Sequence, residues 1–580
     1  MTPAEAHRRY RWRLAQPMPA AIQQATAGLH PLLAQVLHGR GLRDGQQMAA
    51  FLDGHYLESR DPFLLAGMEA AVARVQQAID ADEQIVVYGD FDADGVTATV
   101  LLVESLRGLG LERRQVVPYI PHRVDEGYGL NVEALHKLRQ AGAGLVITVD
   151  CGIRSLQEVE AANAVGLDVI ITDHHSLGRR LPAAAAVINP KLPESRYPER
   201  MLAGVGIAFK LAQALRLRLP DRATFDEADL LDLVALGTVA DLAPLRGENR
   251  RLVQEGLQVL NSLRRPGVDA LARVAGLRPG AITAESIAFG LGPRLNAAGR
   301  LDNAYEAARL LAANNSRAAG EHAEKLNRLN RARQGQTAQL TREAEARLDP
   351  SAPLLLIADP SFKPGLVGLV AGRLTEKYYR PAVVVEQGPA ESRGSCRSIP
   401  EFNITHALDQ LADLLERYGG HAQAAGFTIR NERLEEFGRR LTALAAEQLD
   451  LDALQPAVHI DAELSLSDVD WALKESLDRL EPTGTENAAP RFLSRAVQVL
   501  SHRAVGQDGS HLQLNVSDGW RGFKAIAFRQ AGWAGHLPAR VDLVYGLNVN
   551  EFNGRRDLEL VVEDIGLPEP APAGRQAEPS

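Results

Sequence analysis

Short apolar runs alternate with amphipathic stretches between residues 84 and 190. The runs predict buried strands at 85–89, 115–120, 145–149, 169–172 and 186–189. Stretches between most of them, such as 131–141 and 155–165, have the apolar spacing of helices. Strands that alternate with helices predict βαβ units and a mostly parallel sheet.

A second alternation of strands and helices begins near residue 352. An apolar run at 353–358 precedes a helical pattern at 365–374 and a further apolar run at 382–385. Before it, residues 317–348 form a long, polar, Arg-rich helical pattern with few breakers. Such a helix is either a spacer between domains or is supported by packing on both sides.

The last part of the chain has the pattern of a β domain. Short strands separated by turn residues are predicted at 458–462, 496–505, 511–517, 523–528, 541–548 and 558–564. This spacing is typical of a small all-β barrel. The tail from residue 567 is rich in Pro, Ala, Gly and charge, which predicts disorder.

Together these patterns predict an α/β protein with two α/β domains, joined by a long helix, and a C-terminal β-barrel. A chain of 580 residues is too long for one core, in agreement with several domains. The predicted segments are an N-terminal helical or mixed segment at 1–75, a first α/β domain at 76–302, a connecting helix at 303–348, a second α/β domain at 349–453, the barrel at 454–566 and the tail at 567–580.

The composition is that of a globular protein without a membrane segment. Apolar residues make up 45% and charged residues 24%, and no apolar run approaches the roughly 18 residues that span a bilayer. The N-terminal residues lack the apolar core of a signal peptide, and the two cysteines suit a reducing compartment, so we expect a cytoplasmic protein. The net charge of −9 argues only weakly against a nucleic acid partner, because the local distribution of Lys and Arg decides that question.

The first candidate for chemistry is the segment 88–95, YGDFDADG. Asp90, Asp92 and Asp94 stand at alternate positions directly after a predicted strand. Three like charges this close are tolerable only where solvent or cations absorb the charge, and Mg²⁺ or Mn²⁺ with oxygen ligands is the natural candidate. Taken alone, the segment is equally compatible with an acidic, solvated turn or a lone calcium loop.

Further acids and histidines follow other predicted elements. Asp150 follows one strand, the triplet Asp173-His174-His175 follows another, and Asp241 follows a helical pattern. Parallel strands bring their carboxyl ends to one rim of the sheet, where ligands bind. The side chains that could hold two divalent cations are those of Asp90, Asp92, Asp94, Asp150, His174 and Asp241.

Two such cations, bridged by Asp150, could activate a water and stabilise the oxygens of an in-line phosphoryl displacement. Oxygen-rich ligation favours Mg²⁺ or Mn²⁺, and a His ligand favours Mn²⁺. Each group taken singly has a structural alternative, because an Asp after a strand is often a helix N-cap and a His pair is often partly buried structure. Several acidic or histidine clusters at one rim are poorly explained in that way, so the joint pattern favours a metal site.

The segments GDFDADG, ITVDCG and Asp173-His174-His175 resemble the DHH phosphoesterase superfamily. Within it, the chain is similar to the RecJ family of bacterial single-strand-specific exonucleases over about residues 25–565. The other segments that carry the resemblance are LAGVGIAFK at 202–210, GTVAD at 237–241, GPRLNAAGRLD at 292–302, GSCRSIP at 394–400 and GGHAQAAG at 419–426. The last of these resembles the glycine-glycine-histidine motif of the DHHA1 domain, and the terminal β domain resembles the OB-fold of the family.

The resemblance implies an enzyme of DNA repair and recombination that degrades single-stranded DNA from the 5′ end to mononucleotides, with two Mn²⁺ or Mg²⁺ ions. It implies that the six residues named above bind the metals and that His175 faces the scissile phosphate. The catalytic residues would be Asp150, His174, His175 and His421. Phosphate would be held by Ser395 and Arg397 with Arg294 or Arg300, and by Gly420 and His421 of the second α/β domain.

The resemblance also implies partners. The OB-fold would bind the continuation of the strand through backbone charge and base stacking. The aromatic candidates for stacking, most of them expected in the barrel core, are Trp520, Phe523, Phe528, Trp533, Tyr545 and Phe552. A single-strand-binding protein and a RecQ-like helicase are the implied protein partners of a chain expected to be a monomer.

The chain departs from the family pattern at two places. Residues 362–365 read FKPG where relatives have Trp-His before Pro-Gly, and residues 480–487 are looser than the usual segment at the entry to the OB-fold. Two other functions stay open: a DHH-type phosphodiesterase or pyrophosphatase on small phosphate esters or oligoribonucleotides, and a non-catalytic DNA-binding scaffold. The enzymes of the first kind are usually shorter and lack the barrel that is predicted here. Scaffolds of the second kind lose metal ligands, whereas this chain has all six candidate ligands.

Overall fold

The computed structural model describes residues 9–54, 60–123, 125–552 and 554–568. The chain forms two units, one of residues 57–454 with 484–486, and one of residues 1–56 with 455–483 and 487–580. Among the residues described, no helix is both long enough and apolar enough to cross a membrane. The tail that the sequence predicts to be disordered lies, from residue 569 on, outside the described residues.

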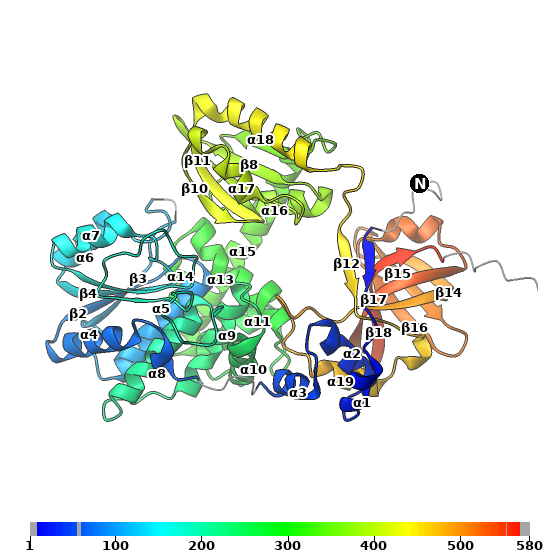
Figure 1. Ribbon diagram of the computed structural model, residues 1–580, viewed down its shortest axis with the longest axis horizontal. Coiled ribbons are helices and arrows are strands. Elements are labelled where there is room, and N and C mark those ends of the chain that lie inside the picture. Colours follow the sequence, from blue (N-terminus) through cyan, green and yellow to red (C-terminus); the bar gives the residue numbers. More distant parts are fainter. Residues whose placement is uncertain (1–8, 55–59, 124, 553, 569–580) are drawn as a thin grey trace, which may run out of the picture. The chain divides into compact units, whose positions relative to one another are not determined.

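The larger unit begins with a five-stranded sheet in the order β3-β2-β4-β5-β6, and every pair of neighbours is parallel, as predicted. Its strands are β2 (Gln84–Tyr88), β3 (Val116–Tyr119), β4 (Ala143–Val149), β5 (Asp168–Thr172) and β6 (Ala186–Ile188). Helices α6 (Val132–Gln140) and α7 (Leu156–Ala164) cover one face, and α4 (Met68–Asp80), α5 (Ala93–Gly108) and α8 (Gly204–Arg218) cover the other (Figure 1).

The strands are apolar on both sides because both faces of the sheet are covered. In β2, Ile85 and Val87 point into one hydrophobic core, and Val86 and Tyr88 point into the other. Since the strands are parallel, the loops that follow β2, β4 and β5 all emerge at the same rim.

A group of helices follows the sheet. Its elements are η2 (Glu227–Leu230), α9 (Leu231–Ala240), α10 (Gly247–Asn261), α11 (Pro266–Val274), α12 (Ala284–Ser286), η3 (Ile287–Leu291), α13 (Gly292–Leu301), α14 (Tyr305–Leu311) and α15 (Ser316–Glu345). The long helix α15 packs against α11, α13 and α14 and then against α16. The sequence left open whether this polar helix is a spacer between domains or is supported by packing, and its contacts show that it is supported by packing.

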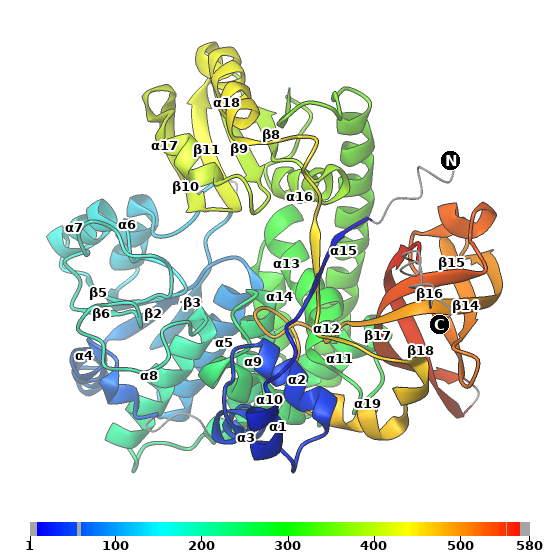
Figure 2. The same ribbon diagram turned by 45° about the vertical axis from the view of Figure 1, so that its right-hand side comes forward.

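The second sheet of this unit, of which β8, β9, β10 and β11 are labelled in Figure 2, has the order β10-β11-β9-β8-β7, and only β7 and β8 in it are parallel. The strands are β7 (Leu355–Asp359), β8 (Ala382–Gln387), β9 (Glu391–Arg397), β10 (Leu415–His421) and β11 (Ala424–Arg430). The helices are α16 (Val367–Tyr378), α17 (Ile404–Asp409) and α18 (Leu434–Gln448).

The smaller unit is built on the predicted barrel. Its sheet has the order β13-β14-β15-β16-β18-β17, closed by pairing of β14 with β17. The strands are β13 (Ala462–Glu463), β14 (Phe492–Val505), β15 (His511–Ser517), β16 (Gly522–Ala527), β17 (Arg540–Phe552) and β18 (Arg555–Gly566). The helix α19 (Trp471–Asp478), which the turn-rich pattern did not predict, interrupts the strands.

The N-terminal residues belong to the same unit as the barrel. Strand β1 (Arg11–Leu14) pairs in parallel with β12 (Ala457–Ile460), and the indole of Trp12 donates to Asp564. Helices α1 (Ala20–Ala25), α2 (Pro31–Gly39) and α3 (Gly45–Asp53) follow β1. Hydrophobic and polar patterning carries no signal for a pairing between segments more than 400 residues apart, so the sequence alone predicted only a helical or mixed segment at 1–75.

The aromatic residues of the barrel divide by exposure. Trp533 and Tyr545 are buried in its core, while Trp520 is 92% and Phe528 53% exposed. Base stacking needs an accessible ring face, so only the exposed rings remain candidates, together with the half-buried Phe523. The side chain of Phe552 lies outside the described residues.

Candidate metal centre

The acidic segment at 90–94 forms the turn from β2 into α5. Asp92 is the N-cap of α5, and its Oδ1 accepts hydrogen bonds from the backbone N–H groups of Asp94 (2.9 Å) and Gly95 (3.1 Å). The turn is tight, since a Cβ at Gly95 would lie 2.6 Å from the backbone nitrogen of Asp90. The cap holds the three carboxylates close together at the rim of the sheet.

Asp94 is fixed by the start of another helix. Its two carboxylate oxygens accept from the backbone N–H groups of Gly204 (2.7 Å) and Val205 (2.8 Å), in the first turn of α8. A helix N-terminus presents free N–H groups and the positive end of the helix dipole, which stabilises a carboxylate there. The motif LAGVG at 202–206 thus contributes backbone donors to the site.

Asp150 directly follows β4 and has a backbone φ of +63°. This left-handed conformation is uncommon for a residue other than glycine, and such residues cluster at functional sites. Asp150 is not a helix cap, because Ser155 is the N-cap residue of α7. The structural alternative considered from the sequence therefore does not apply to it.

Asp173 orients the neighbouring imidazole of His175. Its Oδ1 lies 2.7 Å from His175 Nδ1 and accepts from the backbone N–H of the same residue at 3.0 Å. The backbone of the histidine pair is held as well, because Asn189 donates to the carbonyl of His175 (3.0 Å) and Lys191 donates to that of His174. Both rings therefore have fixed positions at the rim.

These side chains converge. His174 Nε2 lies 3.0 Å from Asp150 Oδ1, 3.7 Å from Asp241 Oδ2 and 4.0 Å from Asp94 Oδ2. Asp241 is the C-cap of α9. Three groups each place one ligand atom per residue within 4.8 Å of the others: Asp90 with Asp92 and Asp150, Asp94 with His174 and Asp241, and Asp150 with His174 and His175.

Asp150 is shared by two of these groups, and Asp92 and Asp94 fall in different ones. The site therefore brings together all six residues selected from the sequence as metal ligands, and His175 with them. Their roles as ligands stay predictions.

Unpaired atoms test whether cations fit here. Asp90 Oδ1, Asp150 Oδ1 and His174 Nε2 are buried and form no hydrogen bond of suitable geometry among the described residues, although the last two atoms lie 3.0 Å apart. An unpaired buried polar atom is costly, and several at one place call for an ion or water. Carboxylate oxygens with one imidazole nitrogen are suitable donors for Mn²⁺ or Mg²⁺.

The electrostatics of the acidic cluster also favour bound cations. Burial, reinforced by the neighbouring carboxylates, raises the pKa of Asp90, Asp150 and Asp241 well above the usual range and that of Asp94 to about 7. Burial and then the charge of His175 lower the pKa of His174 to about 3. The carboxylates repel one another, and divalent cations would supply positive charge that offsets this repulsion.

Guanidinium groups border the acidic cluster. Arg123 lies 4.5 Å from the ring centroid of Phe91. Burial, and then the charges of Arg123 and Arg333, lower the pKa of Arg300 to about 9. Arg300 donates to the carbonyl of Gly365 at 3.0 Å, and the charge of Arg397 also acts on it. Crowded guanidiniums of this kind favour an anion.

Ser395 and Arg397 lie together at the start of α16. Arg397 donates to Ser395 Oγ (3.3 Å) and to the carbonyl of Cys396 (2.8 Å). A Cβ at Gly368 would lie 3.0 Å from Ser395 Oγ and 3.2 Å from an Arg397 nitrogen. The two side chains thus lie against the first turn of the helix, a setting that suits a phosphate.

Arg294 has a different environment. Its guanidinium donates to Asn327 Oδ1 (3.2 Å) and to the carbonyls of Gly290 (2.7 Å) and Val274 (3.5 Å). These partners lie within the group of helices, so Arg294 joins helices to one another. Of the two arginines named as alternatives, Arg300 has the surroundings expected of a phosphate contact.

Gly420 and His421 end β10 in a hairpin with β11. Gly420 has a φ of +151°, and a Cβ there would lie 2.3 Å from the carbonyl oxygen of Ala424, so the hairpin itself requires glycine. Gly420 therefore lies in a strand, next to the turn of the hairpin. Burial, His175 and Lys191 lower the pKa of His421.

Other residues at the site were not selected from the sequence as site residues. Besides Asp173, Lys191 and Arg123, they include Tyr128, whose hydroxyl lies 3.2 and 3.4 Å from the two nitrogens of His175. Arg123 and Tyr128 come from the loop after β3, a strand whose carboxyl end lies at the same rim. Their location directly after a predicted strand could therefore have identified Arg123 and Tyr128 from the sequence as candidate site residues.

The structure shows the surroundings of the residues at the two departures from the family pattern. Phe362 is buried, and Lys363 is exposed with its Nζ 3.1 Å from Gln336 Oε1. At the other departure, the buried side chain of Asn487 donates to the carbonyls of Leu480 (3.0 Å) and Pro482 (2.7 Å).

Family models match three parts of the chain. The DHH family, N-terminal domain, matches residues 84–238, the DHHA1 domain matches residues 352–447, and the RecJ OB domain matches residues 460–564. The single-stranded-DNA-specific exonuclease RecJ of Escherichia coli strain K12 is 36% identical over 562 residues, which cover 93% of this chain and 96% of the relative. The chain belongs to the RecJ family.

Solved RecJ structures agree in fold. RecJ of Thermus thermophilus in complex with Mn²⁺ matches with a TM-score of 0.84 and 32% identity, over 97% of this chain and 80% of that one. The complex of the same RecJ with Mg²⁺ matches with a TM-score of 0.78 and 31% identity, over 97% and 79%. The RecJ fold of two α/β domains and an OB-fold barrel, which the sequence predicted, is therefore confirmed.

Proposed function

We propose that this chain is a metal-dependent exonuclease that degrades single-stranded DNA from the 5′ end to mononucleotides. One observation carries the proposal. In a chain of the RecJ family, six acidic and histidine side chains from separate elements converge, and three of their buried atoms form no hydrogen bond of suitable geometry among the described residues. Mn²⁺ or Mg²⁺ is the proposed cofactor, with two ions per site.

The residues that would hold the ions are Asp90, Asp92, Asp94, Asp150, His174 and Asp241, with Asp150 shared between the two. When bound, such ions make a water nucleophilic and neutralise charge on the phosphate oxygens. The chain contributes the positions, because the N-termini of α5 and α8 fix Asp92 and Asp94, and Asn189 and Lys191 fix the histidine backbone.

His175 is proposed to face the scissile phosphate. Burial lowers its pKa, but the hydrogen bond and the charge of Asp173 outweigh that effect and raise the pKa above the usual value. An imidazolium held by Asp173 through Nδ1 can direct Nε2–H to a phosphate oxygen and keep a proton there. His421 would contribute a second imidazole from the end of β10.

The end of the strand is proposed to bind at the basic groups. Arg300, with Ser395 and Arg397 beside the first turn of α16, would hold the terminal phosphate. The exposed aromatic rings of the OB-fold would stack on bases farther along. Action in DNA repair and recombination, a monomeric state, a cytoplasmic location, and association with a single-strand-binding protein and a RecQ-like helicase stay expectations from the resemblance.

The proposal is tested with single-stranded DNA labelled at either end, with duplex DNA and with pyrophosphate, each with Mn²⁺ and with EDTA. We expect label to be released from the 5′ end first, duplex DNA to survive, and EDTA to stop the reaction. Survival of single strands with Mn²⁺, or loss that begins at the 3′ end, contradicts the proposal. Hydrolysis of pyrophosphate alone would support the alternative of an enzyme for small phosphate esters, against which the match to the RecJ OB domain weighs.

The phosphate site predicts a selective defect. Arg397→Ala should raise the KM for 5′-phosphorylated strands about tenfold or more, because a hydrogen bond between charged groups contributes about 1.5–3 kcal/mol. The KM for strands with a 5′-hydroxyl should change little. Arg393→Ala, at an exposed position on the same strand β9, is the matched control. Equal KM changes for the two kinds of end would exclude the assigned role of Arg397.

A further inference from the structure

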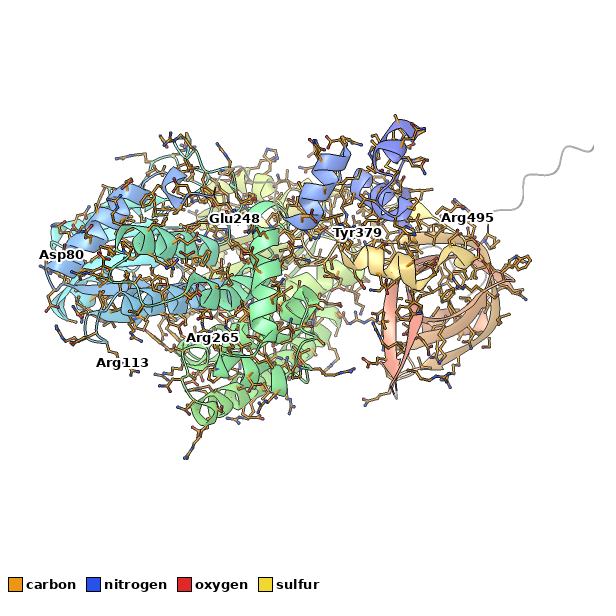
Figure 3. The ribbon with its side chains drawn as sticks, turned by 90° about the horizontal axis from the view of Figure 1, so that it is seen from below. Asp80, Arg113, Glu248, Arg265, Tyr379 and Arg495 are labelled. Carbon is orange, nitrogen blue, oxygen red and sulfur yellow. The ribbon has the colours of Figure 1, made fainter. Side chains whose placement is uncertain are left out.

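A buried ion cluster lies away from the candidate ligands. Lys210 of α8 and Glu248 of α10 are 2% and 1% exposed, and Lys210 Nζ lies 2.6 Å from Glu248 Oε1. The hydroxyl of Tyr197, also buried, donates to Glu248 Oε2. Glu248, labelled in Figure 3, lies in the first turn of α10. Both oxygens of its carboxylate are therefore paired.

The first partner of Glu248 connects it to Asp94. Lys210 stands on the same helix as Gly204 and Val205, whose N–H groups hold the two oxygens of Asp94 at 2.7 and 2.8 Å. A rigid helix transmits a displacement along its axis, so a shift at the pair of Lys210 with Glu248 would move these donors.

The second partner connects Glu248 to the histidine pair. Tyr197 belongs to the segment between β6 and α8, which begins with Asn189 and Lys191, the residues that hold the backbone of His175 and His174. The same turn of α10 forms two further hydrogen bonds to this segment. The backbone N–H of Glu248 donates to Glu199 Oε2 (3.2 Å), and Asn249 donates to the carbonyl of Met201 (2.5 Å).

We propose that Glu248 is a positioning residue for the metal site, since its one carboxylate joins α8, which holds Asp94, to the segment that holds His174 and His175. This inference rests on the metal binding proposed above and assigns a role to the end of the motif LAGVGIAFK. Residues that orient metal ligands from behind commonly affect metal affinity by about 10–100-fold when they are replaced.

The variant Glu248→Gln keeps the shape of the side chain and removes its charge. A cavity of about 670 Å³, lined in part by Lys210 and Glu248, borders the cluster, so water has room to solvate the Lys210 ammonium, which also keeps its hydrogen bond to Gln213 (2.9 Å). Glu306→Gln is the matched control. Glu306 is also buried and pairs with Lys325 and His322, but it lies on α14, which carries none of the candidate ligands.

The full chain is freed of metal, and Mn²⁺ binding is measured by the electron paramagnetic resonance signal of free Mn²⁺. For Glu248→Gln we expect the Kd for Mn²⁺ to rise about 10–100-fold, with kcat restored to within about threefold by excess Mn²⁺ and the KM for DNA unchanged. Glu306→Gln should bind Mn²⁺ like the wild type. An unchanged Kd in folded Glu248→Gln, even with a lowered Tm, would show that the cluster is only structural.

A second variant keeps the test decisive if Glu248→Gln does not fold. Tyr197→Phe removes one hydrogen bond to the same carboxylate and leaves the pair of Lys210 with Glu248, so the Kd should rise in the same direction by a smaller factor, about threefold to tenfold. An unchanged Kd in this variant overturns the proposal. Failure of the wild type to bind Mn²⁺ would instead contradict the proposed function.

Discussion

Asp150→Asn is expected to abolish the degradation of single strands, with kcat reduced at least about 1,000-fold, equivalent to about 4 kcal/mol in the activation barrier. Asp150 belongs to two of the three groups of converging ligand atoms, as His174 does, so in the proposed two-ion site the loss of its carboxylate would affect both ions. Asn has almost the same shape and tolerates the left-handed backbone at this position, where φ is +63°. The measurement is release of label from the 5′ end with saturating Mn²⁺.

Measuring the Tm separates this loss of activity from a loss caused by unfolding. Burial and four neighbouring carboxylates raise the pKa of Asp150, so its charge is unfavourable in the metal-free protein. The metal-free Asn variant should therefore have a Tm equal to or above that of the wild type, and Mn²⁺ should raise the Tm of the wild type more than that of the variant. Asp150→Ala should be equally inactive but somewhat less stable, because alanine disfavours a positive φ. An Asp150→Asn protein that keeps more than about a tenth of the wild-type kcat would refute the shared role.

Much of the site was predictable because its residues follow strands whose apolar runs are unmistakable. The run at 85–89 identified β2, and parallel packing then placed Asp90 and Asp150 at one rim without any knowledge of side-chain positions. The OB-fold strands were predictable for a similar reason. The predicted strand at 511–517 coincides with β15, since alternating side chains and turn residues mark it on both sides.

The supporting contacts were not predictable in this way. The donors to Asp94 are backbone N–H groups more than 100 residues away in the sequence. Because every non-proline residue has such a group, the residue types of Gly204 and Val205 do not identify them as donors. The pairing of Lys210 with Glu248 likewise depends on how α8 and α10 are placed, and both helices pack against α9. Sequence patterns identify which residues carry chemistry, whereas the packing of helices decides what holds those residues in place.

Gly204→Ala is expected to reduce kcat about 100-fold or more by steric displacement of Asp150. A Cβ at position 204 would lie 2.6 Å from Asp150 Cβ and 2.7 Å from Asp150 Oδ1, closer than real atoms approach, so the carboxylate or the helix must shift. A misplacement of about 1 Å at a catalytic site commonly costs about 100-fold in rate. The substitution removes no charge and no donor, because the N–H that holds Asp94 remains.

Gly206→Ala is the matched control for this prediction. It lies one position beyond Val205 in the same helix, and the atoms nearest to its added Cβ would be those of the Leu202 side chain, at an ordinary contact distance of 3.5 Å. Both substitutions exchange glycine for alanine within α8 and change its intrinsic helix propensity alike. Gly206→Ala should keep kcat within about threefold of the wild type, and Mn²⁺ affinity should fall only in Gly204→Ala. Equal kcat values in the two variants would mean that α8 can move away from Asp150 freely, and that the close approach of α8 to Asp150 does not position the carboxylate.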